Sequence, residues 1–387
     1  MKIAVYTNSY KPIVSGVVTA IALFRQGLIA QGHEAIVLAP DYYGYKDQEE
    51  GIYRYPSVDL TRKVRFPVAV PWCRRIDETV RKFKPDLIHS HHPFVLGPVA
   101  LKMARRMSIP LVYTFHTQYE QYSHYVPLRQ DFVKRMTRER IRRFANKADL
   151  VTTPAESATD LLRFYGVNRE ILVVPNPIDL SNFESQEGSA VRRQLGLDPE
   201  DLVTISIGRL GVEKNLGFMI EAFARMIALA PELPLRLILV GAGPDEARLR
   251  ELSARLGLGE RLVLAGSVPY LAVPSYLAAA DLFLMSSVTE VKPLVLLEAM
   301  GAGLPIVAVR ASGAIDTIIE GQEGLMTGLD QEEFAAAAVS LLRDRTRRHA
   351  MSENGKATVN RYSLDTVTAI LSSHFAATVA AKARAKA

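Results

Sequence analysis

The sequence predicts an α/β protein built from two doubly wound domains, each with a parallel sheet. Short, continuous apolar runs alternate with longer amphipathic segments, which is typical of strands buried on both faces and of the helices that connect them. The alternation stops at the Pro- and Asn-rich stretch 175–183 and then starts again. With 387 residues, the chain is too long for one ordinary core and fits two domains of roughly 180–200 residues each.

The first domain is expected at residues 1–178. In chain order its strands are expected at 2–7, 34–40, 87–92, 111–117, 149–154 and 171–176. The amphipathic stretch 18–32 separates the first two strands and ends at Gly32, as a helix with a glycine C-cap does. Because strand, helix and strand follow one another, we expect the sheet to be parallel.

The second domain is expected at residues 179–360. Its strands are expected at 202–210, 235–243, 261–268, 282–287, 305–309 and 324–327. A last helical stretch, 361–380, has no strand partner left in this domain. We therefore expect residues 361–387 to cross back to the first domain, with a frayed end after residue 380.

Composition excludes several classes of protein. The contents of 48% hydrophobic and 23% charged residues are those of a soluble globular protein. The single cysteine, Cys73, excludes a disulfide framework and a cysteine metal cluster, and it favours a reducing cytoplasm. The N-terminus has no apolar segment long enough for a signal peptide. We also expect no stretch that approaches the ~20 apolar residues needed to span a bilayer.

Basic charge is concentrated in the first half of the chain. Residues 1–180 hold 26 Lys and Arg against 17 Asp and Glu, a net charge of +9, so the remainder carries −3 of the total of +6. The segments 61–84 and 129–147 mix basic with apolar side chains, as interfacial segments do. Anionic headgroups attract such segments by ~1 kcal/mol per basic residue near the surface. No nucleic-acid module is recognisable, so we expect an anionic membrane surface as the partner, and no nucleic acid.

The candidates for membrane contact lie in the first of these segments, although a solvated helix face explains either segment alone equally well. They are Arg62, Lys63, Arg65, Trp72, Arg74 and Arg75. Three tyrosines that follow the expected strand 111–117 form a candidate amphipathic surface for an acceptor, or else an ordinary buried helix face. They are Tyr119, Tyr122 and Tyr125.

Residues that directly follow strands are the best candidates for ligand binding, because open α/β sheets bind ligands at the carboxyl ends of their strands. Arg209 and Lys214 bracket a loop after the strand at 202–207, and a helix is expected to begin near Asn215. Two cations beside a helix N-terminus form a good site for a diphosphate. Gly16 lies between the first strand and the first helix, where it would let backbone amides approach an anionic group or a sugar.

A second glycine motif follows the strand at 235–240. Gly241 and Gly243 resemble a dinucleotide-binding fingerprint, but the third glycine is missing, which weakens an interpretation as a hydride-transfer enzyme. Gly243 and Pro244 form either a turn that approaches a ligand or simply a tight loop.

Histidines cluster at two expected strand ends. His116 follows the strand 111–115 at a position that points toward a ligand cleft, where imidazole can bind a sugar hydroxyl or assist charge movement. For His89 and His92 we favour a structural role, and no spacing in the group selects a metal.

Two carboxylates flank an apolar run in the stretch TEVKPLVLLE. Glu290 is expected on a loop after the strand 282–287, and Glu298 on the helix that follows, so that both face a ligand while the leucines pack on the sheet. Pro293 is expected at the first helical position, where its missing N–H has no cost.

Together these motifs resemble the retaining glycosyltransferases of family 4, which have the GT-B fold: two Rossmann-like domains that face each other across a cleft, and a C-terminal helix that crosses back. The motifs are IGRLGVEKN, LILVGAGP, LVLAGSVP and TEVKPLVLLEAMGAGLPIVAV, and the likeness covers nearly the whole chain. SYKPIVSGVVTAI and FHTQYEQYSHYVP are more specifically similar to the branch that glucosylates diacylglycerol.

The resemblance implies an acceptor and membrane domain at 1–178 and a nucleotide-sugar domain at 179–360. It implies that Arg209 and Lys214 bind the donor diphosphate without a metal or other cofactor, and that Glu298 takes the ribose hydroxyls. Glu290 and His116 would face the transferred sugar, and Gly16 would approach the phosphates. Retention in this family is usually drawn as same-face attack assisted by the leaving phosphate.

The sequence departs from the family at the start of the helix after Glu290. The family commonly has an aromatic residue or glutamine followed by glycine here, and free N–H groups meet the sugar, whereas this chain has Lys292, Pro293 and Leu294. Proline removes one donor, and Lys292 either replaces it at a hydroxyl or phosphate or is only solvated.

The leading hypothesis is a peripheral, cytoplasmic-face enzyme that moves a hexose, expected to be glucose from UDP-glucose, to diacylglycerol or a glycolipid. The alternatives are another acceptor (phosphatidylinositol or a soluble sugar) and a nucleotide-sugar-binding protein that has lost turnover because of Lys292-Pro293. Nothing in the sequence indicates an oligomeric state.

Overall fold

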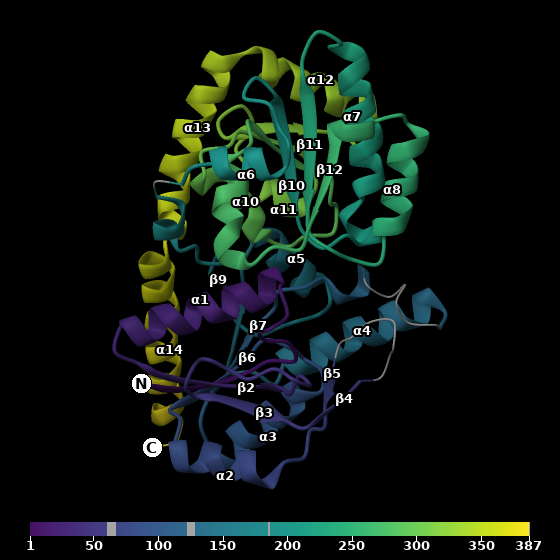
Figure 1. Ribbon diagram of the computed structural model, residues 1–387. Coiled ribbons are helices and arrows are strands. Elements are labelled where there is room, and N and C mark those ends of the chain that lie inside the picture. The colour runs from purple at the N-terminus through teal and green to yellow at the C-terminus, as the bar shows by residue number, and fades with distance from the viewer. Residues whose placement is uncertain (60–66, 122–127, 185, 387) are drawn as a thin grey trace. The chain divides into compact units, whose positions relative to one another are not determined.

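The structure, a computed structural model, describes residues 1–59, 67–121, 128–184 and 186–386 (Figure 1). It divides into two compact units, which we call unit 1 (Met1–Pro177 with Leu364–Ala387) and unit 2 (Ile178–Ser363). Each unit is a Rossmann-like α/β domain with a parallel sheet. The predicted fold class of two doubly wound domains is therefore confirmed.

Unit 1 contains a seven-stranded parallel sheet in the order β3-β2-β1-β6-β7-β8-β9. Its strands are β1 (Lys2–Tyr6), β2 (Glu34–Pro40), β3 (Ile52–Tyr55), β6 (Leu87–Ser90), β7 (Leu111–Thr114), β8 (Leu150–Thr153) and β9 (Ile171–Val173). Its helices are α1 (Gly16–Ala30), α2 (Arg74–Phe83), α3 (Leu96–Met107), α4 (Gln130–Ala145), α5 (Glu156–Phe164) and α14 (Leu364–Arg384). All six strands expected in this domain are present.

Three strands of unit 1 are absent from the prediction. They are the edge strand β3 and an antiparallel pair, β4 (Ser57–Asp59) with β5 (Pro67–Ala69). The β3 sequence, IYRY, is largely half-buried and lacks the continuous apolar run by which the other strands were recognised. At three residues each, β4 and β5 are also too short to show a period.

The terminal helix α14 belongs to unit 1. Its Leu371 and Phe375 are buried in the same apolar cluster as Ile21 and Phe24 of α1. By length and composition alone, α14 could cross a bilayer, and it is the one helix among the described residues that passes this test. This corrects the expectation that the chain has no such stretch. This is weak evidence for a membrane span, because helices packed in a protein core pass the same test.

Unit 2 contains a six-stranded parallel sheet in the order β12-β11-β10-β13-β14-β15. Its strands are β10 (Leu202–Ile207), β11 (Leu235–Val240), β12 (Leu262–Gly266), β13 (Leu282–Met285), β14 (Ile306–Val309) and β15 (Gly324–Thr327). Its α-helices are α6 (Ser189–Gln194), α7 (Leu216–Leu229), α8 (Glu246–Arg255), α9 (Val273–Ala278), α10 (Leu294–Gly301), α11 (Ser312–Ile315), α12 (Gln331–Arg343) and α13 (Arg345–Val359). Short 3₁₀ turns include η3 (Val212–Lys214), η5 (Tyr270–Ala272) and η6 (Asn360–Tyr362).

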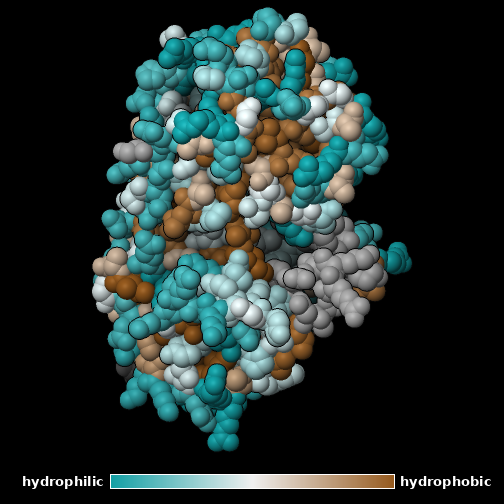
Figure 2. Space-filling view, viewed as in Figure 1, coloured by the Kyte–Doolittle hydropathy of each residue, from teal (hydrophilic) through white to brown (hydrophobic). Residues whose placement is uncertain are grey.

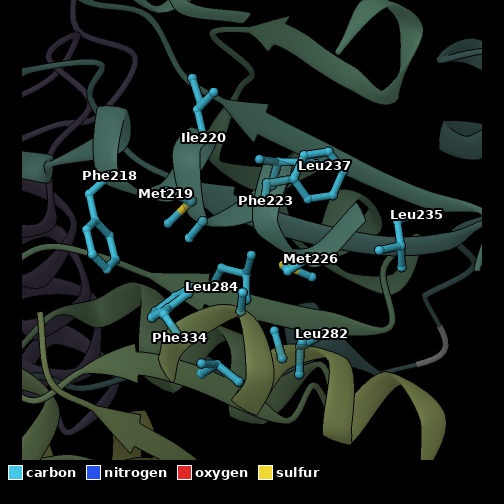
Figure 3. Close-up of a cluster of buried hydrophobic side chains, with 14 of the residues drawn as sticks. Phe218, Met219, Ile220, Phe223, Met226, Leu235, Leu237, Leu282, Leu284 and Phe334 are labelled. Atoms are coloured by element: carbon cyan, nitrogen blue, oxygen red, sulfur yellow. The ribbon is translucent and has the colours of Figure 1, made fainter. Parts of the chain in front are cut away.

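The core of unit 2 lies where α7 and α12 pack on the sheet. Phe223 and Met226 of α7 meet Leu237 and Leu284 of the sheet, and Phe334 of α12 closes the cluster (Figure 3). On the molecular face shown in Figure 2, apolar side chains of unit 2 gather around the position of β11, between polar side chains on the neighbouring helices. Burial on this scale fixes the sheet rigidly, so the loops at its strand ends are held in place.

Candidate functional site

A pocket lies at the carboxyl ends of β10 and β13, where the strand order of unit 2 reverses. β11 pairs with β10 on one side and β13 pairs with it on the other, so the loops that follow β10 and β13 diverge there. Such a reversal is where doubly wound sheets bind ligands. The polar or charged lining residues include Ser206, Arg209, Lys214, Ser286, Ser287 and Glu290.

The loop after β10 supplies the two predicted cations. Arg209 and Lys214 both line the pocket, and α7 begins one residue after Asn215, as the sequence predicted. Lys214 Nζ forms an ion pair with the Glu290 carboxylate, and both side chains are about four-fifths buried. The ion pair therefore joins the two loops that diverge from the strand ends.

The glycines after β11 act as spacers for this loop. A side chain on Gly241 would strike the Gly208 carbonyl, and one on Gly243 would strike the Leu210 carbonyl. Leu210 N–H donates to the Ala242 carbonyl at 3.1 Å, so the two loops run in direct backbone contact. Of the two alternatives for this motif, the described contacts favour the tight loop.

The loop after β13 carries Glu290, and α10 carries Glu298, as predicted. Hydroxyls tie this loop to the first one: Ser287 and Thr289 donate to the Glu213 carbonyl at 3.2 and 3.4 Å. The position expected for Pro293 is wrong by one residue. It is the N-cap of α10, with ψ at 117°, and the helix begins at Leu294.

The side of the same loop that faces away from Lys214 contacts α11 and Tyr362, near the end of unit 2. Ser312 Oγ donates to the Glu290 carbonyl at 3.1 Å, and Gly313 lies against Glu290 and Pro293. Lys292 is buried, and its ammonium donates to the Asp316 carbonyl. The interpretation of Lys292 as a solvated residue is therefore wrong. Its side chain is also not among those that line the pocket.

Glu298 is buried within α10, beside Tyr270 of η5. Burial raises the pKa of the Glu298 carboxyl to about 7, although the Tyr270 hydroxyl partly offsets this rise. Glu298 is not among the residues that line the pocket with Glu290. The two glutamates thus occupy different environments: one is paired with a cation, and burial favours the protonated form of the other.

In unit 1, four histidines meet near the carboxyl ends of β6 and β7. His91 Nδ1 lies 2.8 Å from His116 Nε2, and the two rings are stacked. His89 lies 2.6 Å from the Thr114 hydroxyl, and His92 accepts from the Asn8 N–H at 3.2 Å, as the structural role predicted for both requires. His91 was not singled out in the sequence, because nothing in HSHH distinguishes it from its neighbours.

Burial keeps these imidazoles neutral. It lowers the pKa of His89 and His116 to about 3 and that of His92 to about 4, and it holds the pKa of His91 well below its usual value. Among the described residues, no three His, Cys, Asp or Glu side chains are grouped so that they could hold a metal ion. The His91–His116 contact is therefore a hydrogen bond between neutral rings, in which one ring donates and the other accepts.

The remaining predicted residues of unit 1 are only partly described. Gly16 is the first residue of α1, and the space that a side chain would occupy there is empty. Tyr119 is half-buried against the Phe94 ring, with centroids 5.1 Å apart. Trp72 is 79% exposed, and Arg74 and Arg75 are exposed beside it at the start of α2. The other candidates lie outside the described residues: Tyr122, Tyr125, Arg62, Lys63 and Arg65.

Comparisons with known proteins define the class. The sequence family described as Glycosyltransferase Family 4 matches residues 14–182, and the one described as Glycosyl transferases group 1 matches residues 189–358. Anabaena Alr3699/HepE, solved in complex with UDP, has the same fold: the TM-score is 0.79 at 22% identity, and the match covers 97% of this chain and 100% of that one. The molecule is a glycosyltransferase with the GT-B fold.

Two relatives narrow the assignment. The alpha-monoglucosyldiacylglycerol synthase of Acholeplasma laidlawii is 29% identical over 345 residues, which cover 86% of this chain and 86% of that protein. The alpha-monoglucosyldiacylglycerol synthase of Streptococcus pneumoniae is 31% identical over 316 residues, which cover 80% of this chain and 71% of that protein. The chain belongs to family 4 of the glycosyltransferases, as its motifs indicated.

The contact between α11 and the Glu290 loop predicts that a methyl group added at Gly313 will disturb the pocket. A side chain at Gly313 would lie 2.8 Å from Glu290 Cβ, closer than real Cβ atoms approach, and 3.0 Å from Pro293 Cδ, which is also tight. We expect Gly313→Ala to displace the loop and weaken UDP binding about tenfold by calorimetry, with a loss of about 1–3 kcal/mol in unfolding free energy. Gly355→Ala is the matched control, because its added Cβ would meet only ordinary contacts at 3.5 Å. Unchanged binding in Gly313→Ala would contradict the contact.

The buried histidines predict a loss of stability in acid. Unfolded histidines bind protons below about pH 6.5, whereas the folded ones stay neutral until about pH 3–4. Their contribution is therefore complete above pH 6.5 and is lost as the pH falls through this window. At pH 5.5, one such histidine lowers the free energy of unfolding by about 1.4 kcal/mol relative to neutral pH. Urea unfolding at pH 7.5 and 5.5 should show a smaller pH dependence in His89→Gln than in the control His349→Gln, which alters an exposed histidine. An equal change in the free energy of unfolding between the two pH values in both variants would contradict the prediction.

Proposed function

We propose that the protein is a retaining, metal-independent glycosyltransferase that transfers a hexose, glucose from UDP-glucose, to a membrane lipid such as diacylglycerol or a glycosyl-diacylglycerol. The observation that carries the proposal is the pocket at the strand reversal, which joins Arg209, Lys214 and Glu290. The names of the two bacterial relatives support the sugar and the lipid acceptor.

The chemistry assigned to the pocket follows from its charges. A diphosphate bound beside Arg209 and Lys214 takes the place of the Glu290 carboxylate as the partner of Lys214. The two cations then stabilise the negative charge that develops on the departing nucleotide diphosphate. Glu290, released from its ion pair, faces the sugar, where a carboxylate binds hydroxyls or stabilises an oxocarbenium-like centre.

The neutral residues have complementary roles. His116 has a pKa of about 3, so at neutral pH it meets a sugar hydroxyl as a neutral hydrogen-bond partner, and a charged imidazolium is disfavoured. Glu298 accepts from the ribose hydroxyls, and its pKa of about 7 falls once those hydroxyls donate to it. Gly16 at the start of α1 offers backbone N–H groups to the phosphates.

An acceptor dissolved in a membrane requires a surface that meets lipid, and α4 offers one. Phe132 and Met136 are 46% and 56% exposed on this helix, next to Leu128. Arg129 and Arg135 line the same shallow groove, so apolar and basic side chains lie together. With the exposed Trp72, this surface supports peripheral binding at the cytoplasmic face of an anionic membrane.

Transfer of labelled glucose from UDP-glucose tests the function directly. We expect a labelled glycolipid in vesicles that contain diacylglycerol and an anionic lipid, at full rate in a chelator, with retained configuration by NMR. Lys214→Met should lower kcat at least a hundredfold, because it removes a cation from the leaving group, while the exposed control Lys356→Met should not.

Other results would redirect or overturn this proposal. Full activity with a soluble sugar and no lipid would favour another acceptor. UDP binding without turnover, with turnover restored by Pro293→Gly, would favour a protein that binds nucleotide sugars only; Pro293 gives this alternative its basis, because the N-cap of α10 has no N–H. No transfer from any nucleotide sugar, whatever the acceptor, would refute the function.

The α4 surface predicts a loss of membrane binding on substitution. Burying a large apolar side chain contributes about 1.5–3 kcal/mol. The double variant Phe132→Ser/Met136→Ser should therefore bind anionic vesicles at least tenfold more weakly in a sedimentation assay. Leu329→Ser is the control, since Leu329 is 61% exposed in unit 2. Equal loss in both variants, or in neither, would exclude α4 as the membrane surface.

A further inference from the structure

Lys292 is a buried cation whose function the site described above leaves open. Its residue is 7% exposed, and an ammonium withdrawn from water is costly unless it is well paired. Its Nζ donates to the Asp316 carbonyl and, at 3.3 Å, to the Tyr362 hydroxyl. It also lies 4.9 Å from the centre of the Tyr362 ring, which makes a cation–π contact. The contacts of this one charge thus include a carbonyl of Asp316 and both the hydroxyl and the ring of Tyr362.

The charge persists at neutral pH. Burial lowers the pKa of Lys292 to about 8; the Asp316 carboxylate opposes this fall and the Arg361 guanidinium adds to it. Burial of this charge weakens folding, and apolar side chains of similar size often replace buried ion pairs without loss of stability. Packing alone gives no reason for a lysine here.

One partner of Lys292, Tyr362, lies where the chain enters and leaves unit 2. Tyr362 is next to Ser363, the last residue of unit 2 before α14. The Tyr362 carbonyl accepts from the N–H of Ile178, the first residue of the unit, at 2.9 Å, and Ile178 also pairs with Ser363. The segments by which the chain enters and leaves unit 2 are therefore hydrogen-bonded to each other at Tyr362, the residue that binds Lys292.

The other end of this connection is the donor pocket. Lys292 is two residues from Glu290 and directly precedes the N-cap of α10, so a pull on its backbone moves the loop that carries Glu290. The pocket side of that loop is held by the Lys214 ion pair and by hydroxyls that bind the Glu213 carbonyl. Lys292 holds the opposite side.

We propose that Lys292 is a positioning residue: it anchors the Glu290 loop to Tyr362, so that the segment joining the two chain passages sets the place of Glu290 in the donor pocket. This inference rests on the proposed function for its effect on transfer. It accounts for a charge that weakens folding, because a hydrogen-bonded cation fixes the loop in one place, as an apolar side chain cannot.

The test compares Lys292→Met and Tyr362→Phe in the full chain, with Lys356→Met as the exposed-lysine control. We expect Lys292→Met to keep or raise the free energy of unfolding at pH 7, because it removes a buried charge. The dissociation constant of UDP should change less than threefold, whereas UDP-glucose loses the extra affinity that its sugar supplies, and kcat falls at least tenfold. Tyr362→Phe, which keeps the ring and loses the hydroxyl, should show the same pattern at smaller size.

The pH profile separates positioning from stability. The folded pKa of about 8 lies below the unfolded value of about 10.4, so the contribution of Lys292 to stability is complete above pH 10.4 and is lost as the pH falls through 8. Wild-type kcat should fall as the ammonium deprotonates above pH 8, while stability rises. In Lys292→Met both trends should be absent.

Hydrogen exchange decides the inference even if no donor is turned over. Backbone amides of residues 287–292 should exchange faster in Lys292→Met and Tyr362→Phe than in the wild type, with the rest of unit 2 unchanged. Unaltered exchange, or a fall in kcat that merely follows a loss of stability, would overturn the positioning role. Faster exchange in a wild type that transfers no sugar would instead refute the proposed function and leave the anchor intact.

Discussion

The reversal of strand order beside β10 is the constraint on which the site of unit 2 depends. It leaves two loops diverging from neighbouring strand ends, and the ion pair of Lys214 with Glu290 closes the gap between them. The glycines after β11 allow the first loop its close backbone contact. A rigid sheet thus presents a cation and a carboxylate that are already opposed. In the function proposed above, a bound diphosphate would replace the Glu290 carboxylate as the partner of Lys214.

Much of this arrangement could be predicted from the sequence, because strand and loop patterns are local. Continuous apolar runs located twelve of the fifteen described strands, and the loops after them carry Arg209, Lys214 and Glu290. Strand β3 has no continuous apolar run, and β4 and β5 have only three residues each. The sequence predicts Pro293 at the first position of α10, whereas it is the N-cap, because an apolar pattern does not distinguish these two neighbouring positions.

What the sequence could not reveal depends on contacts between distant segments. His91 lies 25 positions from His116, and Lys292 lies 70 from Tyr362. A sequence pattern cannot indicate contacts between residues so far apart. Lysine is also expected at the surface, because burial of its charge is costly. The different environments of Glu290 and Glu298 arise in the same way: Glu290 meets a cation from another loop, and Glu298 is buried beside Tyr270 of η5.

Lys292 and Pro293 together change how the start of α10 can act. A proline at the N-cap leaves that residue without an N–H, so the nearest backbone donors come from Leu294 onward and from the loop before Pro293. Those loop residues can serve a sugar only if they are held still, and Pro293 already fixes its own φ near −69°. Lys292, the residue before Pro293, is held by the contacts of its ammonium with Tyr362 and Asp316. On the positioning role proposed above, the pair exchanges one hydrogen-bond donor for a loop that is held at both Lys292 and Pro293, and Glu290 is the side chain that this loop carries.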